Sequence, residues 1–97
     1  MRFEWDEVKN RRNRRKHKIS FEVAKSAFDD QFALSLPDRI VEGEERWQTL
    51  GMISDLVVAV AHTYREEDED LVIRIISARK ATPTERIAYA NNYEASG

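Results

Sequence analysis

Apolar residues along the chain change their spacing near residue 30. Before this point, Phe21, Ala24, Ala27 and Phe28 recur at helical spacing behind Ser20, a residue type that caps helices. They predict a helix that ends at Asp29 and Asp30. After this point, apolar residues gather in short runs bounded by turn residues, which is typical of β-strands. The predicted strands cover residues 32–36, 45–53, 56–65 and 71–79.

The boundaries of these strands come from polar residues. Pro37-Asp38 is expected to break the first of them, and Ser54-Asp55 joins the second to the third. The acidic run Glu66–Asp70 is expected to form the loop of the last hairpin. The four strands therefore follow one another directly, as in an antiparallel meander.

The first sixteen residues predict a short edge strand and a helix. The strand is expected at Arg2–Trp5, and Asp6 is a good N-cap for a helix that runs to about Lys16. This helix is unusual, because it has no apolar face after Val8. Little of it can be buried, so its surface should consist largely of guanidinium groups.

The last helix has a clear start signal. Thr82, Pro83 and Glu85 form a capping box with proline at the first helical position. Ile87, Ala88 and Tyr89 are expected to face inward. The element order β-α-α-β-β-β-β-α predicts an α+β fold, with two N-terminal helices packed on a four- to five-stranded, mainly antiparallel sheet and a C-terminal helix.

Composition narrows the class of protein. Ninety-seven residues are enough for one domain, which we expect to span 1–97. The absence of cysteine excludes disulfides, thiolate zinc sites and thiol nucleophiles. The charged start MRFEWDEVK is no secretory signal, and no apolar run is long enough to span a bilayer. We therefore expect a soluble, cytoplasmic protein that does not contact membranes.

Positive charge is concentrated in one segment. The chain has 16 basic and 18 acidic residues, yet residues 9–18, KNRRNRRKHK, hold seven of the basic ones and no acidic one. The remainder is strongly acidic. Concentrated positive charge is typical of a surface that meets a polyanion.

An ordered set of residues from about 3 to 89 resembles the BrnT family. The matching pieces are FEWD at 3–6, Lys9, Asn13, Lys16-His17, SFEVA at 20–24, Phe28, Asp30, EER at 44–46, Gly51, Thr63, Arg65, RIISAR at 74–79, Ala81, ER at 85–86 and Tyr89. The resemblance implies a ribonuclease toxin of a type II toxin–antitoxin module with a fold similar to the RelE/ParE superfamily. It also implies a BrnA-like antitoxin, a ribbon-helix-helix DNA-binding protein, with DNA bound only through the antitoxin complex.

RNA cleavage through the ribose 2′-hydroxyl needs a base, an acid and cations that stabilise the phosphorane. Arg65 and Arg79 both fall at strand ends, and we expect them to bind the scissile phosphate together. Alternation along the strand places Ser77 on the same face as Arg79, Ile73 and Ile75, and we expect its hydroxyl to be a hydrogen-bonding neighbour in the phosphate site. Arg79 also resembles, by position, the active-site arginine of RelE-like enzymes.

The basic segment supplies the other candidates. His17 can act as base or acid near neutral pH, although it could instead cap the helix end. Lys16, Lys9, Arg12, Arg15 and Arg74 are expected to bind RNA. Three alternatives stay open. Arg74 could pair with Glu45 or Glu85, the arginines could dock an acidic antitoxin segment, and His62 could be a core residue.

Three functions are compatible with these patterns. The first is a metal-independent, cofactor-free endoribonuclease that inhibits translation and is neutralised by its antitoxin. The second is a non-catalytic corepressor module that keeps only the antitoxin interface. It is favoured by Val41 and Glu42, which stand where many relatives carry a histidine. The third is a plain nucleic-acid binder.

Overall fold

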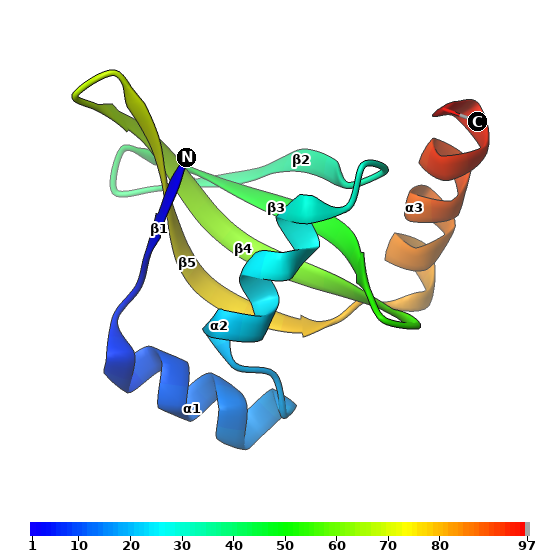
Figure 1. Ribbon diagram of the computed structural model, residues 1–97, viewed down its shortest axis with the longest axis horizontal. Coiled ribbons are helices and arrows are strands. Elements are labelled where there is room, and N and C mark those ends of the chain that lie inside the picture. The colour runs from blue at the N-terminus through cyan, green and yellow to red at the C-terminus, as the bar shows by residue number, and fades with distance from the viewer. Residues whose placement is uncertain (97) are drawn as a thin grey trace.

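The computed structural model describes residues 1–96, and Gly97, the last residue of the predicted domain, lies outside the described residues. Five strands, three α-helices and one 3₁₀-helix follow one another (Figure 1). They are β1 (Arg2–Glu4), α1 (Glu7–His17), α2 (Phe21–Ala24), η1 (Lys25–Asp29), β2 (Leu34–Val41), β3 (Glu44–Ile53), β4 (Leu56–Glu67), β5 (Asp70–Lys80) and α3 (Pro83–Ser96). No helix in this part of the chain is long and apolar enough to cross a membrane.

The five strands form one mixed sheet in the order β1-β5-β4-β3-β2. The meander β2–β5 is antiparallel, but β1 runs parallel to β5. The α+β class and the C-terminal helix are confirmed. The prediction of two N-terminal helices on a mainly antiparallel sheet is corrected, because the sheet is mixed and the second helix is a single turn continued by η1. After β1 the chain passes through α1, α2 and η1, and β2 then forms the opposite edge of the sheet. The following strands are added in order from that edge, so the last strand, β5, lies beside β1.

The two faces of the sheet carry separate cores. On one face, α2 and η1 pack against Val58, Val60, Ile73, Ile75 and Ala78. On the other face, Leu50, Val57 and Ala59 pack with Ala81 and Tyr89. Alternate residues of β4 point to opposite faces of the sheet, so this strand contributes to both cores. Helices α2 and η1 cover one face, and α3 covers the other.

A β-bulge in β5 changes the expected alternation of its side chains. Ala61 pairs with Ser77, whereas the next residue, His62, pairs with Ile75, so Ile76 is the extra residue. A bulge of one residue moves everything beyond it to the opposite face. Ser77 and Arg79 therefore lie on the face that carries α3, and the prediction that they share a face with Ile75 is wrong.

Two strand boundaries also differ from the sequence prediction. β2 continues through Pro37-Asp38 to Val41, because the proline sits at an irregularity of the register rather than at a break. The hairpin loop is shorter than the predicted run Glu66–Asp70, since β4 extends to Glu67 and β5 begins at Asp70. Only Asp68 and Glu69 turn, both with positive φ.

The start of α3 follows the predicted capping box. Glu85 N–H donates to Thr82 Oγ1 at 3.2 Å, and Thr82 N–H donates to Glu85 Oε1 at 2.8 Å. Tyr89 is buried as expected, and its hydroxyl donates to Asp30 at 2.5 Å. Burial and this carboxylate together raise the pKa of Tyr89 to about 12. Ile87 is 63% exposed, so its predicted inward position is wrong.

Candidate functional site

Helix α1 has no apolar stripe and is held in place by two buried asparagines. The side-chain amide of Asn13 donates to the carbonyl oxygens of Ile19 at 2.9 Å and Ala78 at 2.8 Å, and its oxygen accepts from Ala78 N–H at 3.1 Å. Asn10 donates to Glu22 and accepts from Phe21 N–H, both at 2.8 Å. These amides replace the apolar packing that usually fixes a helix to a sheet.

The position of Asn13 is explained by the edge of β5. β1 pairs with β5 only over Val72, Ile73 and Arg74, which leaves the outer edge farther along without a neighbouring strand. Asn13 bonds both the N–H and the C=O of Ala78, as a partner strand would. The sequence analysis gave Asn10 and Asn13 no role. The available signal was two asparagines three residues apart in a stretch, 9–16, that otherwise contains only lysine and arginine.

One side of α1 and the bulged part of β5 enclose a hollow of about 220 Å³. Its lining residues are Lys9, Arg12, Asn13, Lys16 and His17 from α1, with Ile76 and Ser77 from β5. The α1 residues are spaced three and four apart, so they share one side of the helix. The structure thus brings together five predicted site residues from two elements far apart in sequence: Lys9, Arg12, Lys16, His17 and Ser77.

The cations of α1 form no ion pairs in the described part of the chain, although Asp6 and Glu22 lie close enough to be affected by them. Within residues 1–96, none of the seven basic residues of segment 9–18 forms an ion pair with a carboxylate. Three basic residues of the sheet behave differently, since Arg2, Arg65 and Arg79 all pair with acids. The hollow therefore lies in a region of unneutralised positive charge, which attracts anions.

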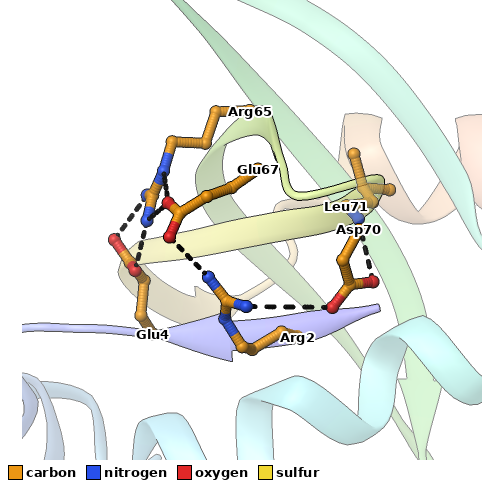
Figure 2. Close-up of polar contacts among 6 residues, drawn as sticks. All are labelled: Arg2, Glu4, Arg65, Glu67, Asp70 and Leu71. Carbon is orange, nitrogen blue, oxygen red and sulfur yellow. Dashed lines mark hydrogen bonds and ion pairs between the residues drawn. The ribbon is translucent and has the colours of Figure 1, made fainter.

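Arg65 lies in a network of carboxylates at the far end of the sheet. Its guanidinium donates to Glu4 at 2.7 and 2.8 Å and to Glu67 at 3.0 and 2.8 Å (Figure 2). Arg2 joins Glu67 at 3.1 Å and Asp70 at 4.0 Å. The hydrogen bonds from Arg65 lower the pKa of both Glu4 and Glu67, so these carboxylates stay charged. Arg65 is thus already neutralised.

Arg79 has its own carboxylate partner. It donates to the two oxygens of Glu85 at 2.7 and 3.0 Å, and this pairing is the main cause of the raised pKa of Arg79 and the lowered pKa of Glu85. Because β4 and β5 are antiparallel, their carboxyl ends lie at opposite ends of the sheet: Arg79 pairs with Ala59, whereas Arg65 pairs with Val72. The prediction that Arg65 and Arg79 bind one phosphate together is therefore wrong.

Two predicted RNA-binding residues, Arg74 and Arg15, do not line this hollow. Arg74 is exposed, pairs in register with Thr63, and shares the sheet face of Ser77. Neither Glu45 nor Glu85 forms an ion pair with it among the described residues. Arg15 belongs to α1 and lies next to Arg12 and Lys16 on the solvent side.

His62 is a core residue. It is fully buried, its Nε2 lies 2.7 Å from Thr49 Oγ1, and its ring packs edge-on against Phe28 and Tyr64. Burial lowers the pKa of His62 to about 4, so its imidazole is neutral at pH 7. His17 is accordingly the one histidine that the structure places beside the cations of α1.

The hollow contains the side-chain types that phosphate chemistry requires. Lys9, Arg12 and Lys16 present cations, Ser77 presents a hydroxyl, and His17 presents an imidazole that can accept or donate a proton. No group of three His, Cys, Asp or Glu side chains within residues 1–96 is arranged to hold a metal ion.

Two comparisons with known proteins were made, one with curated proteins and one with models of protein families. A search of curated proteins gives no significant match. A family model described as "Ribonuclease toxin, BrnT, of type II toxin-antitoxin system" matches residues 5–85. This match covers most of the chain, including α1, the bulge of β5 and the start of α3. The chain therefore belongs to the BrnT family of ribonuclease toxins of type II toxin–antitoxin systems.

Proposed function

We propose that this protein is a metal-independent endoribonuclease that cleaves RNA in the hollow between α1 and β5. The main support is the composition of that hollow, where three cations, one imidazole and one hydroxyl converge from α1 and β5. Within residues 1–96 none of these cations forms an ion pair with a carboxylate. A phosphodiester needs these groups when the ribose 2′-hydroxyl attacks it. The carboxylate-paired arginines of the sheet supply none of them in free form.

Each group has a role in the proposed reaction. Lys16 and Arg12 hold the scissile phosphate and stabilise the charge of the phosphorane, and Lys9 binds a neighbouring phosphate. Ser77 donates a hydrogen bond to a non-bridging oxygen. His17 takes the proton of the 2′-hydroxyl while water protonates the leaving 5′ oxygen, or His17 protonates the leaving oxygen while water takes the proton of the 2′-hydroxyl. One well-placed donor typically contributes about 3–4 kcal/mol to the transition state, so losing Lys16 should reduce the rate roughly 10²–10³-fold.

The arginines outside the hollow divide into two groups. Arg15 lines the adjoining hollow with Arg12 and Lys16, and Arg74 is exposed on the sheet face of Ser77. Neither forms an ion pair with a carboxylate within residues 1–96, so we assign them to flanking phosphates. Arg79 is held by Glu85, and we assign it to the junction between β5 and α3. Arg65 belongs to the carboxylate network at the hairpin end and takes no part in cleavage.

The partner in this proposal is a BrnA-like ribbon-helix-helix antitoxin that neutralises the toxin and connects it to DNA. The family match supports a protein antitoxin, since type II modules pair two proteins. The alternative function is a non-catalytic corepressor module. It is favoured by Glu42, which occupies the β2–β3 turn in place of the histidine expected from the resemblance.

The test uses the whole chain, purified free of its partner. End-labelled mRNA is incubated with the protein in excess EDTA, and the products are examined for 2′,3′-cyclic phosphate and 5′-hydroxyl ends. The proposal expects cleavage with those ends, and arrest of translation in a cell-free system. Intact RNA, with and without ribosomes, would favour the corepressor function, and cleavage that requires added metal would contradict metal independence.

A further inference from the structure

The opposite side of α1 carries a second basic surface, of which the proposed site uses only Arg15. Four cations, Arg11, Arg14, Arg15 and Lys18, border an open hollow of about 470 Å³. All four are exposed, and the lining contains no acidic and no apolar residue. We refer to these four residues as the outer basic surface.

The outer basic surface is continuous with the proposed site. A third hollow, of about 370 Å³, is lined by Arg12, Arg15 and Lys16. It shares Arg12 and Lys16 with the hollow that contains His17, and it shares Arg15 with the outer basic surface. A single path of cations therefore runs from the proposed site around α1 to the other side of the helix.

Folding accounts for only part of this arrangement. Arg14 and Arg15 lie in the last turn of α1, where the helix dipole favours cations, and Lys18 Nζ donates to the Arg15 carbonyl at 3.1 Å, but Arg11 lies a turn earlier. Like charges four residues apart on a helix repel each other, as Arg11 does Arg15. The chain has more acidic than basic residues, yet no carboxylate within residues 1–96 pairs with any of these cations. A bound polyanion would remove this repulsion.

The composition of the surface favours RNA over a protein partner. Protein interfaces have a core of aromatic and apolar side chains, whereas the lining of the outer basic surface has only cations. Guanidinium groups match the geometry of phosphate oxygens. Arg11 and Lys18 are separated by about 10 Å along the helix axis, a length that spans several phosphates of one strand.

We propose that the outer basic surface binds the phosphate backbone of the same RNA, on the flank of the scissile bond, so that the strand passes from the hollow around α1. The identity of the RNA rests on the proposed function. Binding on this surface is sequence-independent and extends the footprint of the enzyme beyond the nucleotides held in the hollow.

The experiment compares the native chain with the triple variant Arg11→Gln/Arg14→Gln/Lys18→Gln, which keeps good helix formers on α1. Fluorescent 2′-O-methyl oligonucleotides of 5 and 20 nucleotides resist cleavage and serve as probes, titrated between 50 and 300 mM KCl. A matched control, Lys25→Gln/Arg39→Gln/Lys80→Gln, removes three exposed cations from other elements. Circular dichroism checks that all variants keep their helix content.

For the triple variant we expect at least tenfold weaker binding of the 20-mer at 100 mM salt. The slope of log K against log salt should fall by about 2, since each single-strand phosphate contact contributes roughly 0.7. Binding of the 5-mer should be unchanged, and the control variant should match the native chain. Unchanged affinity and slope for the 20-mer would overturn the proposal.

Two further outcomes separate this inference from the proposed function. If the native chain cleaves no RNA but the triple variant still loses the salt-dependent binding of the 20-mer, the nuclease proposal fails and the outer basic surface stands. If the triple variant binds and cleaves RNA normally but no longer binds the antitoxin, the surface serves a protein partner and the inference is overturned.

Discussion

Replacing Asn13 by alanine should destabilise the protein more than any other single change on α1. The substitution removes three hydrogen bonds at 2.8–3.1 Å and leaves the N–H and C=O of Ala78 and the C=O of Ile19 without partners. The residue is 7% exposed, so water can reach these groups only partly. Each unpaired buried group costs about 1–3 kcal/mol.

With partial access of water, we expect a loss of roughly 2–4 kcal/mol in the free energy of unfolding. A domain of this size has a total stability of about 5–15 kcal/mol, so the loss is a large fraction of it. Asn13→Asp should be at least as harmful at pH 7, because a carboxylate oxygen would then face two carbonyl oxygens.

The assay is urea denaturation followed by circular dichroism at 222 nm. Asn92→Ala is the control, since Asn92 makes one bond, to the carbonyl of Phe32 at 3.0 Å, and should cost about 1 kcal/mol or less. A loss below about 0.5 kcal/mol for Asn13→Ala would refute the view that this amide attaches α1 to the sheet.

Three further predictions concern stability. A Cβ on Gly51 would lie 2.3 Å from the Ala27 carbonyl oxygen, so Gly51→Ala should cost about 3 kcal/mol or more in urea denaturation, and a change within 1 kcal/mol would contradict this packing. Burial lowers the pKa of His62 from 6.5 to about 4. The unfolded chain therefore binds a proton that the folded chain rejects, and stability should fall by about 1.4 kcal/mol per pH unit as pH drops from 6.5 towards 4. His62→Gln should flatten this slope, and an equal slope in both proteins would refute the assignment. Glu85→Gln removes the charged partner of Arg79 and should cost roughly 1–2 kcal/mol, measured by thermal melting; an unchanged melting temperature would show that this pair does not hold the start of α3.

Features encoded locally could be predicted from the sequence. The N-caps at Asp6, Ser20 and Thr82 each depend on a side chain and a backbone N–H two or three residues away, and all three form as expected. The central strands follow from apolar runs, which need no knowledge of their partners. The basic character of α1 is likewise a property of consecutive residues.

Features set by distant partners could not be predicted. The parallel pairing of β1, the bulge at Ile76 and the bonds between Asn13 and Ala78 all join segments about 65 residues apart or depend on strand register. The prediction that Arg65 and Arg79 bind one phosphate was wrong for the same reason. Both residues end strands in the sequence, but the antiparallel direction of β4 and β5 separates them.

The central claim is that RNA is cleaved between α1 and β5, by groups free of carboxylate partners. Its most direct test is the cleavage rate of one RNA by four purified, partner-free proteins: the native chain, Lys16→Ala, His17→Ala and Arg65→Ala. We predict that Lys16→Ala and His17→Ala lose at least 10²-fold in rate while Arg65→Ala stays within about threefold of the native chain. Full activity of Lys16→Ala and His17→Ala, with loss in a folded Arg65→Ala, would contradict it.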